Sequence, residues 1–124
     1  MATILIIDDD SGVSRALAML VDKDGHRALV ASSAEEGLEA AERERPAAVF
    51  MDVRLPGISG LEALSKMRAL LPDSPVLIMT GHGTLSTAVE AVRNGAFDYL
   101  AKPLSVEAAR AALGRALADR KSVV

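Results

Sequence analysis

Short apolar runs alternate with longer segments of helical period along the 124-residue chain. The apolar runs predict strands near residues 3–7, 27–31, 48–51, 75–79 and 97–101. After each run, apolar residues recur every three or four positions, which predicts a helix. Five βα units with right-handed crossovers give a doubly wound α/β fold, in which helices cover both faces of a five-stranded parallel sheet.

Polar residues directly follow most of these apolar runs. They are Asp8 and Asp9 after the first run, Asp52 after the third, Thr80 after the fourth and Lys102 after the fifth. In open α/β sheets, ligands bind outside the carboxyl ends of the strands. We therefore expect these five side chains to meet at one edge of the sheet and form a site.

Composition limits the class of protein. Half of the residues are hydrophobic but only 2% are aromatic, so the core must be aliphatic, which suits a parallel sheet wrapped by helices. The chain has no cysteine, which leaves no disulfide or thiolate metal site and fits a reducing compartment. No apolar stretch approaches the roughly 20 residues that span a bilayer, and no signal peptide precedes the first strand. These features predict a cytoplasmic protein without a membrane segment.

Charge and length bear on partners and domains. A net charge of −3 argues against direct binding to nucleic acid, because domains that bind it usually carry a basic stripe. The length fits a single domain. We place that domain at residues 1–119, and residues 120–124 as the start of a linker or a frayed C-terminus.

Three carboxylates at one edge of a sheet require a partner. Two such charges ~4 Å apart repel by about 4 kcal/mol at an effective dielectric constant near 20, so the cluster needs protons or a cation. Mg²⁺ is the natural cation, because it prefers oxygen ligands and keeps waters that a phosphate can displace. Lys102 and Thr80 would suit phosphoryl oxygens. Asp52, alone at the end of the central strand, is the exposed candidate nucleophile for an acyl phosphate, and Asp8 and Asp9 are candidate metal holders.

Simpler interpretations fit some of these residues. An acidic or hydroxyl residue after a strand is often the N-cap of the next helix, which is the interpretation we favour for Asp10 and Ser11. Thr80 alone would be a turn residue, and Lys102 alone a solvated charge. Their joint position at strand ends favours a site.

Four motifs resemble the receiver domain of two-component response regulators, in order and over essentially the whole chain. The motifs are Ile6-Ile7-Asp8-Asp9-Asp10, Met51-Asp52-Val53-Arg54-Leu55-Pro56-Gly57, Ile78-Met79-Thr80-Gly81 and Tyr99-Leu100-Ala101-Lys102-Pro103. The resemblance implies a flavodoxin-like (CheY-like) fold with strand order 2-1-3-4-5. It also implies a signalling domain that is not an enzyme, except in its own phosphorylation and dephosphorylation.

The resemblance assigns roles to the acidic residues. Asp52 would accept a phosphoryl group from the phosphohistidine of a sensor histidine kinase. Asp9 and Asp52, with the backbone carbonyl of Arg54, would hold Mg²⁺ directly, and Asp8 would act mainly through water.

The resemblance also assigns a switch. Thr80 and Lys102 would contact the phosphoryl oxygens, and Tyr99 would swing inward as Thr80 moves. The Lys102-Pro103 peptide bond would be cis. The face formed by residues 84–119 would respond, and we hypothesise that phosphorylation changes self-association into a homodimer through it.

The segments 81–84, 88–91 and 95–99 make the chain most similar to receivers of the NtrC class. In that class the receiver controls an ATPase that activates sigma-54 RNA polymerase and is followed by a helix-turn-helix domain. Neither is present, so the chain is either a fragment that acts on an output domain of the same protein or a stand-alone receiver that works by protein–protein interaction.

Specificity for the cognate kinase would be determined by the first helix, near Ser14, Arg15, Leu17 and Ala18, because that face of the helix borders the site.

Other classes of protein fit the sequence less well. A phosphatase of the haloacid dehalogenase type would need a second Asp where this chain has Arg54. A flavodoxin-like cofactor binder would need a phosphate loop after the first strand, where the acidic residues would repel phosphate. A degenerate receiver that is never phosphorylated would not be expected to keep the intact set of Asp8, Asp9, Asp52, Thr80 and Lys102.

Overall fold

The protein is described by a computed structural model that covers residues 1–54, 60–81 and 85–122, apart from the side chains of 85–88 and 120–122. Motif residues 55–57 and 82–83, and residue 84 of the predicted switch face, lie outside the described residues. The elements are β1 (Thr3–Ile7), α1 (Ser11–Lys23), β2 (Arg27–Ala31), α2 (Ala34–Glu44), β3 (Ala48–Asp52), α3 (Gly60–Leu70), β4 (Val76–Thr80), α4 (Leu85–Arg93), β5 (Asp98–Ala101) and α5 (Val106–Ser122).

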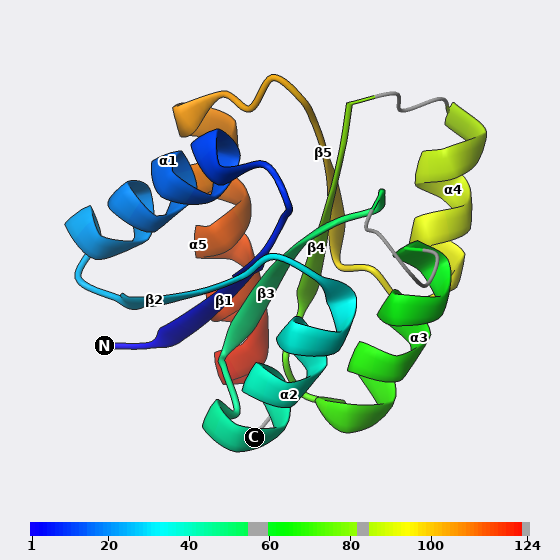
Figure 1. Ribbon diagram of the computed structural model, residues 1–124, viewed down its shortest axis with the longest axis horizontal. Helices are drawn as coiled ribbons and strands as arrows, with labels where there is room; N and C mark the ends of the chain where they lie inside the picture. The colour runs from blue at the N-terminus through cyan, green and yellow to red at the C-terminus, as the bar shows by residue number, and fades with distance from the viewer. Residues whose placement is uncertain (55–59, 82–84, 123–124) are drawn as a thin grey trace.

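The five strands form one parallel sheet in the order β2-β1-β3-β4-β5, which confirms the predicted fold and strand order (Figure 1). β3 is the central strand, and β1 and β4 flank it. Because every strand points the same way, the residues that follow β1, β3, β4 and β5 come out at one edge of the sheet.

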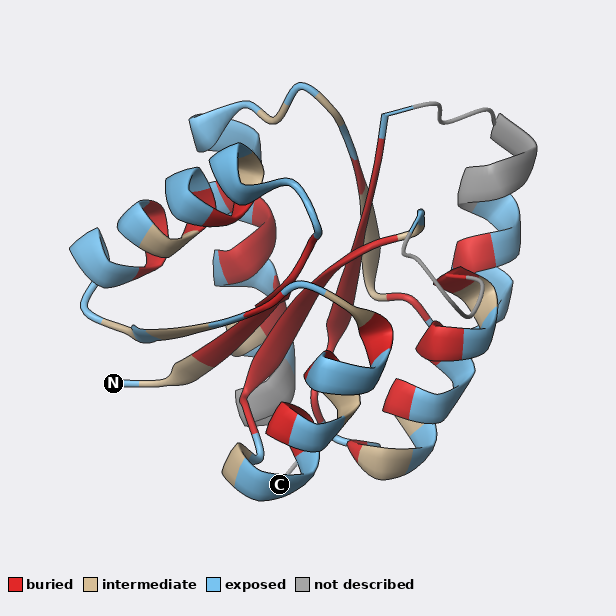
Figure 2. Cartoon of the chain, in the orientation of Figure 1, coloured by how far each residue is buried: buried red, intermediate tan, exposed pale blue. Residues whose placement is uncertain are grey.

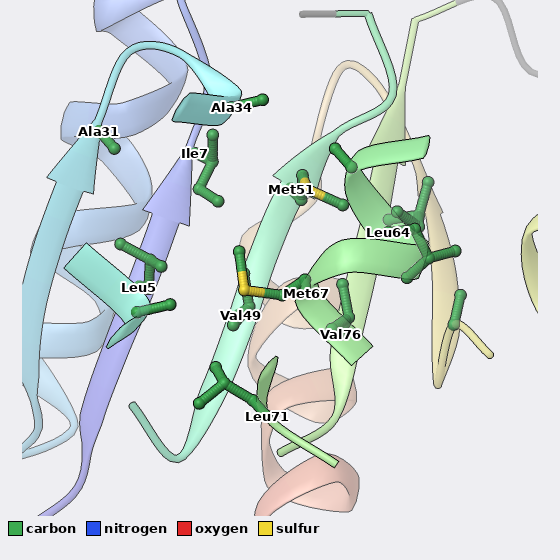
Figure 3. Packing of buried hydrophobic residues seen from close by; sticks show 14 of the residues in the cluster. Leu5, Ile7, Ala31, Ala34, Val49, Met51, Leu64, Met67, Leu71 and Val76 are labelled. Atoms are coloured by element: carbon green, nitrogen blue, oxygen red, sulfur yellow. The ribbon is translucent and has the colours of Figure 1, made fainter. Parts of the chain in front are cut away.

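Two layers of helices bury the two faces of the sheet. Leu5 and Ile7 of β1 face the layer that contains α2 and α3, whereas Ile4, Ile6 and Phe50 face α1 and α5. Figure 2 shows buried strands through the centre of the molecule and exposed outer helix surfaces, and Figure 3 shows the cluster between the sheet, α2 and α3. With both faces covered, β3 and β4 are buried along their whole length, which explains their continuous apolar sequence.

Helix ends follow local capping chemistry. The Asp10 side chain accepts hydrogen bonds from the backbone N–H groups of Gly12 and Val13, which confirms Asp10 as the N-cap of α1. Ser11, which was also expected to cap, is instead the first residue of the helix. α2 ends at Arg45 in the left-handed conformation (φ 48°), a geometry that the helical spacing of the sequence did not predict. α5 continues to Ser122.

Among the described helices, none combines the length and the hydropathy needed to cross a membrane.

Candidate functional site

The sheet brings the predicted polar residues together. Asp52 is the last residue of β3, and Thr80 is the last residue of β4. Ile7 pairs with Met51 in the register between β1 and β3, so Asp8 and Asp52 come next on neighbouring strands. This arrangement follows from strand order alone and gives the two carboxylates a common position at the edge of the sheet.

Lys102 connects the two buried carboxylates. Its Nζ atom lies 2.7 Å from Asp8 Oδ2 and 3.0 Å from Asp52 Oδ2. The Lys102 side chain is 18% exposed, that of Asp52 is 7% exposed and that of Asp8 is fully buried, so the expectation of an exposed Asp52 is wrong. The ammonium group therefore lies between two desolvated charges, where ion pairs are screened far less than at the surface.

The remaining oxygen of each carboxylate is held by the backbone. Asp8 Oδ1 accepts a hydrogen bond of 2.9 Å from the Asp10 N–H, and Asp52 Oδ1 accepts one of 2.9 Å from the Arg54 N–H. In both cases the donor lies two residues further along the chain, the pattern of an Asx turn. These turns fix Oδ1 and leave Oδ2 of both residues for the site.

Asp8 Oδ2 is buried and has no aligned hydrogen bond, although Lys102 Nζ lies within ion-pair distance of it. Burial raises the pKa of the Asp8 carboxyl, the nearby Asp52 charge adds to the rise, and Lys102 and the Asp10 N–H offset it only in part. For Lys102, burial lowers the pKa, but the two carboxylates outweigh burial and leave the pKa above its ordinary value. Asp8 Oδ2 thus pairs with the Lys102 ammonium group and is the Asp8 oxygen that faces the site.

The acidic residues fit a small divalent cation. Asp8, Asp9 and Asp52 each offer one oxygen, and these oxygens lie within 4.8 Å of one another. Asp9 is exposed, so a hydrated ion can reach the cluster from solvent. Oxygen-only ligands from a few carboxylates suit Mg²⁺. The part of Arg54 in such a site, through its carbonyl, remains a prediction.

The hydroxyl and aromatic residues of the predicted switch lie on β4 and β5. Thr80 is 2% exposed and pairs with Ala101, and its carbonyl accepts a 2.8 Å hydrogen bond from the Lys102 N–H. The Lys102–Pro103 peptide bond is cis. Tyr99 is half-buried on β5. The backbone of Thr80 therefore helps to position Lys102, and their roles toward a phosphoryl group remain predictions.

The structure corrects one set of residues expected at a partner surface. Ser14 and Leu17 are 4% and 3% exposed, so they cannot form a kinase-specificity surface, whereas Arg15 is exposed and Ala18 partly so. Ser14 instead supports the site: its hydroxyl donates to the Asp8 carbonyl at 3.2 Å. The signal was present in the sequence, because Ser14 lies three residues before Leu17 on the inward face of the helix.

Residues 4–114 match the family described as the response regulator receiver domain. The chain belongs to this family. The receiver domain is 36% identical over 121 residues to the C4-dicarboxylate transport transcriptional regulatory protein DctD of Pseudomonas aeruginosa, a match that covers 98% of this chain and 26% of that protein. It is 40% identical over 119 residues to the response regulator protein FleR of the same organism, which covers 92% of this chain and 25% of FleR.

Solved structures give the same family. A response regulator receiver domain protein from Clostridium thermocellum superposes with a TM-score of 0.93 at 34% identity, and each chain is covered completely. NtrX from Brucella abortus superposes with a TM-score of 0.91 at 34% identity, over 97% of this receiver domain and 28% of NtrX. The receiver domain thus spans about a quarter of DctD, FleR and NtrX, and their names fit the NtrC-class resemblance of the sequence.

Proposed function

We propose that this receiver domain accepts a phosphoryl group on Asp52 from the phosphohistidine of a sensor histidine kinase, with Mg²⁺ as cofactor. One observation carries the proposal: the Asp52 carboxylate ends the central strand beside a lysine ammonium 3.0 Å away and within a cluster of three carboxylates. This site combines a nucleophile, a cation position and a positive charge for the phosphoryl oxygens.

The transfer exchanges one phosphorus bond for another. A bond forms between an Asp52 carboxylate oxygen and phosphorus while the bond to the histidine nitrogen breaks, and that nitrogen keeps the electron pair. When bound, Mg²⁺ supplies positive charge close to the phosphoryl oxygens. Asp9 and Asp52 would hold it with the Arg54 carbonyl, and Asp8 would contribute mainly through water.

Lys102 and Thr80 would carry the signal from the phosphorylated site. Lys102 would turn its ammonium group from Asp8 and Asp52 toward the phosphoryl oxygens, and the Thr80 hydroxyl would donate to one of them. A charge-assisted hydrogen bond contributes about 1.5 to 3 kcal/mol, but shifting a population from 1:99 to 99:1 takes roughly 5.5 kcal/mol. Thr80 therefore needs help from Lys102, from the cation and from a partner that binds the switched face.

The switched face would comprise residues 84–119, and Tyr99 in this face would swing inward as Thr80 moves. Two exposed valines on α4, Val89 and Val92, give this face an apolar surface for a partner. A homodimer is the partner that we propose, and sedimentation velocity with and without phosphorylation tests it. An unchanged monomer fraction would contradict the proposal.

We propose a sigma-54-dependent type of output, because DctD and the transcriptional regulatory protein ZraR of Escherichia coli carry about three times this length outside the matched region and are named transcriptional regulators. The alternative is a stand-alone receiver that acts by protein–protein interaction. In either form we expect a cytoplasmic domain that neither binds nucleic acid itself nor acts on an external substrate.

Intact-mass measurement tests the phosphoacceptor directly. The wild-type domain, Asp52→Asn and the control Asp73→Asn, which changes an exposed Asp, would be incubated with Mg²⁺ and a small acyl-phosphate donor. We expect one added phosphoryl group in the wild type and in Asp73→Asn, none in Asp52→Asn, and none in any protein with a chelator. Equal phosphorylation of Asp52→Asn would refute Asp52 as the acceptor.

A further inference from the structure

Ser14 is a buried hydroxyl in the first part of α1 whose hydrogen bond leaves the helix. A serine inside a helix commonly bonds back to the carbonyl four residues earlier. Here that carbonyl, Asp10 O, already accepts the Ser14 backbone N–H at 3.1 Å. The Ser14 hydroxyl instead donates to Asp8 O at 3.2 Å, six residues earlier and at the end of β1.

This hydrogen bond completes a set of contacts around Asp8. The Asp8 N–H donates to Ala31 O at 3.1 Å, and Asp8 Oδ1 accepts from the Asp10 N–H at 2.9 Å. With Ser14 on the carbonyl, three of the four polar atoms of Asp8 are fixed by neighbours. The fourth, Oδ2, is the buried atom that faces Lys102 without an aligned hydrogen bond.

The Asp8 carbonyl also belongs to the peptide plane that leads into Asp9. A peptide unit is planar, so fixing its carbonyl oxygen fixes the direction in which the next residue begins. Asp9 is exposed, and no described hydrogen bond holds its side chain. Its place in the cluster of Asp8, Asp9 and Asp52 therefore depends on the backbone that precedes it.

We propose that Ser14 is a positioning residue of the divalent cation site: its hydroxyl fixes the Asp8–Asp9 peptide so that Asp9 can bind the ion directly and Asp8 can bind it through water. The inference rests on the cation site of the proposed function. Loss of a group that orients metal ligands typically weakens metal affinity by about 10- to 100-fold. We expect the lower end for Ser14→Ala, because Ser14 acts through the backbone.

Ser74 offers a matched control at the other edge of the sheet. Like Ser14 it is 4% exposed, and its hydroxyl donates to a backbone carbonyl, Pro46 O, at 2.7 Å. Ser74→Ala therefore removes the same kind of buried hydrogen bond at a place remote from the carboxylates. Both alanine variants should lower the urea midpoint, and alanine is well tolerated in a helix at position 14.

The experiment is a two-dimensional ¹H–¹⁵N NMR titration with MgCl₂ alone. Ser14→Ala should bind Mg²⁺ about tenfold more weakly than the wild type, whereas Ser74→Ala should bind with wild-type affinity. In the metal-free spectra the Asp9 and Asp10 amide signals should move in Ser14→Ala and stay in place in Ser74→Ala.

Three results would overturn the proposal. A Ser14→Ala dissociation constant within twofold of the wild-type value would refute the positioning role while leaving the proposed function intact. An equal loss in Ser74→Ala would show that the effect is general destabilisation. No Mg²⁺ binding by the wild type would remove the cation site itself, and with it both the proposed cofactor and this inference.

Discussion

Replacing Lys102 by methionine isolates the electrostatics of the site. Methionine keeps much of the length of the lysine side chain but removes the ammonium group that lies 2.7 Å from Asp8 Oδ2 and 3.0 Å from Asp52 Oδ2. The change leaves Asp8 buried without its counter-charge. Removing one partner of a buried ion pair typically costs about 3 to 5 kcal/mol of stability.

Protonation of Asp8 sets a ceiling on the cost of leaving it unpaired. The ordinary pKa of the carboxyl is 3.8, so protonating it at pH 7 costs at most about 4.4 kcal/mol, and at pH 5 at most about 1.6 kcal/mol. Because burial raises the folded-state pKa of Asp8, this group favours folding below pH 3.8, and that contribution is lost as pH rises through the folded value. The pKa of Lys102 is also raised, so the contribution of Lys102 to folding is fully present below pH 10.5 and is lost only as pH rises through its folded-state pKa. Between pH 5 and 7, therefore, the pH dependence of the variant comes from Asp8.

Urea unfolding followed by circular dichroism measures the effect. We expect Lys102→Met to lower the free energy of unfolding by about 3 kcal/mol at pH 7 and by no more than about half as much at pH 5. Lys66→Met, which removes an exposed lysine on α3, should change stability by less than about 0.5 kcal/mol. An equal loss for Lys102→Met at both pH values, or a larger loss at pH 5, would refute the argument.

Three further predictions concern helices α3, α5 and α1. A Cβ at Gly60 would lie 2.2 Å from the Val53 carbonyl oxygen, so Gly60→Ala should destabilise the domain by about 1 to 3 kcal/mol in urea. An unchanged stability of Gly60→Ala would contradict this packing argument. A Cβ at Gly114 would meet no atom within 4 Å, so Gly114→Ala should stabilise α5 by about 0.5 to 1 kcal/mol. Asp10→Ala removes the α1 N-cap and should lower the free energy of unfolding in urea by about 1 kcal/mol. Asp10→Ser keeps a capping oxygen and should retain most of the wild-type stability. An equal loss of stability in both variants would exclude capping as the cause.

Much of the fold could be predicted because local patterns and tertiary structure agree. A parallel sheet covered on both faces requires continuous apolar strands, and the runs before Asp52 and Thr80 have that form. Once the strands are parallel, their carboxyl ends share an edge, so the meeting of Asp8, Asp9 and Asp52 follows from sequence order. The prediction needed no knowledge of side-chain contacts.

Features that depend on a particular three-dimensional contact could not be predicted in this way. Arg45 takes the left-handed conformation at the end of α2, and its Nη1 atom donates to the Leu70 carbonyl across to α3, a partner 25 residues away. The close approach of Gly60 to Val53 likewise depends on how α3 starts after the segment beyond β3. Neither feature follows from hydrophobic periodicity, because each involves a contact outside the residue's own helix or strand.

Ser14 belongs to the helix face that was expected to select the kinase because it borders the site. The helical period instead directs Ser14 inward with Leu17 and Val21. A residue next to a functional site can serve it from the buried side, by holding the backbone that carries the ligands. In this domain the buried Ser14 donates to the carbonyl of Asp8, the residue that precedes the exposed Asp9, so in the proposed cation site the position of Asp9 would depend on Ser14.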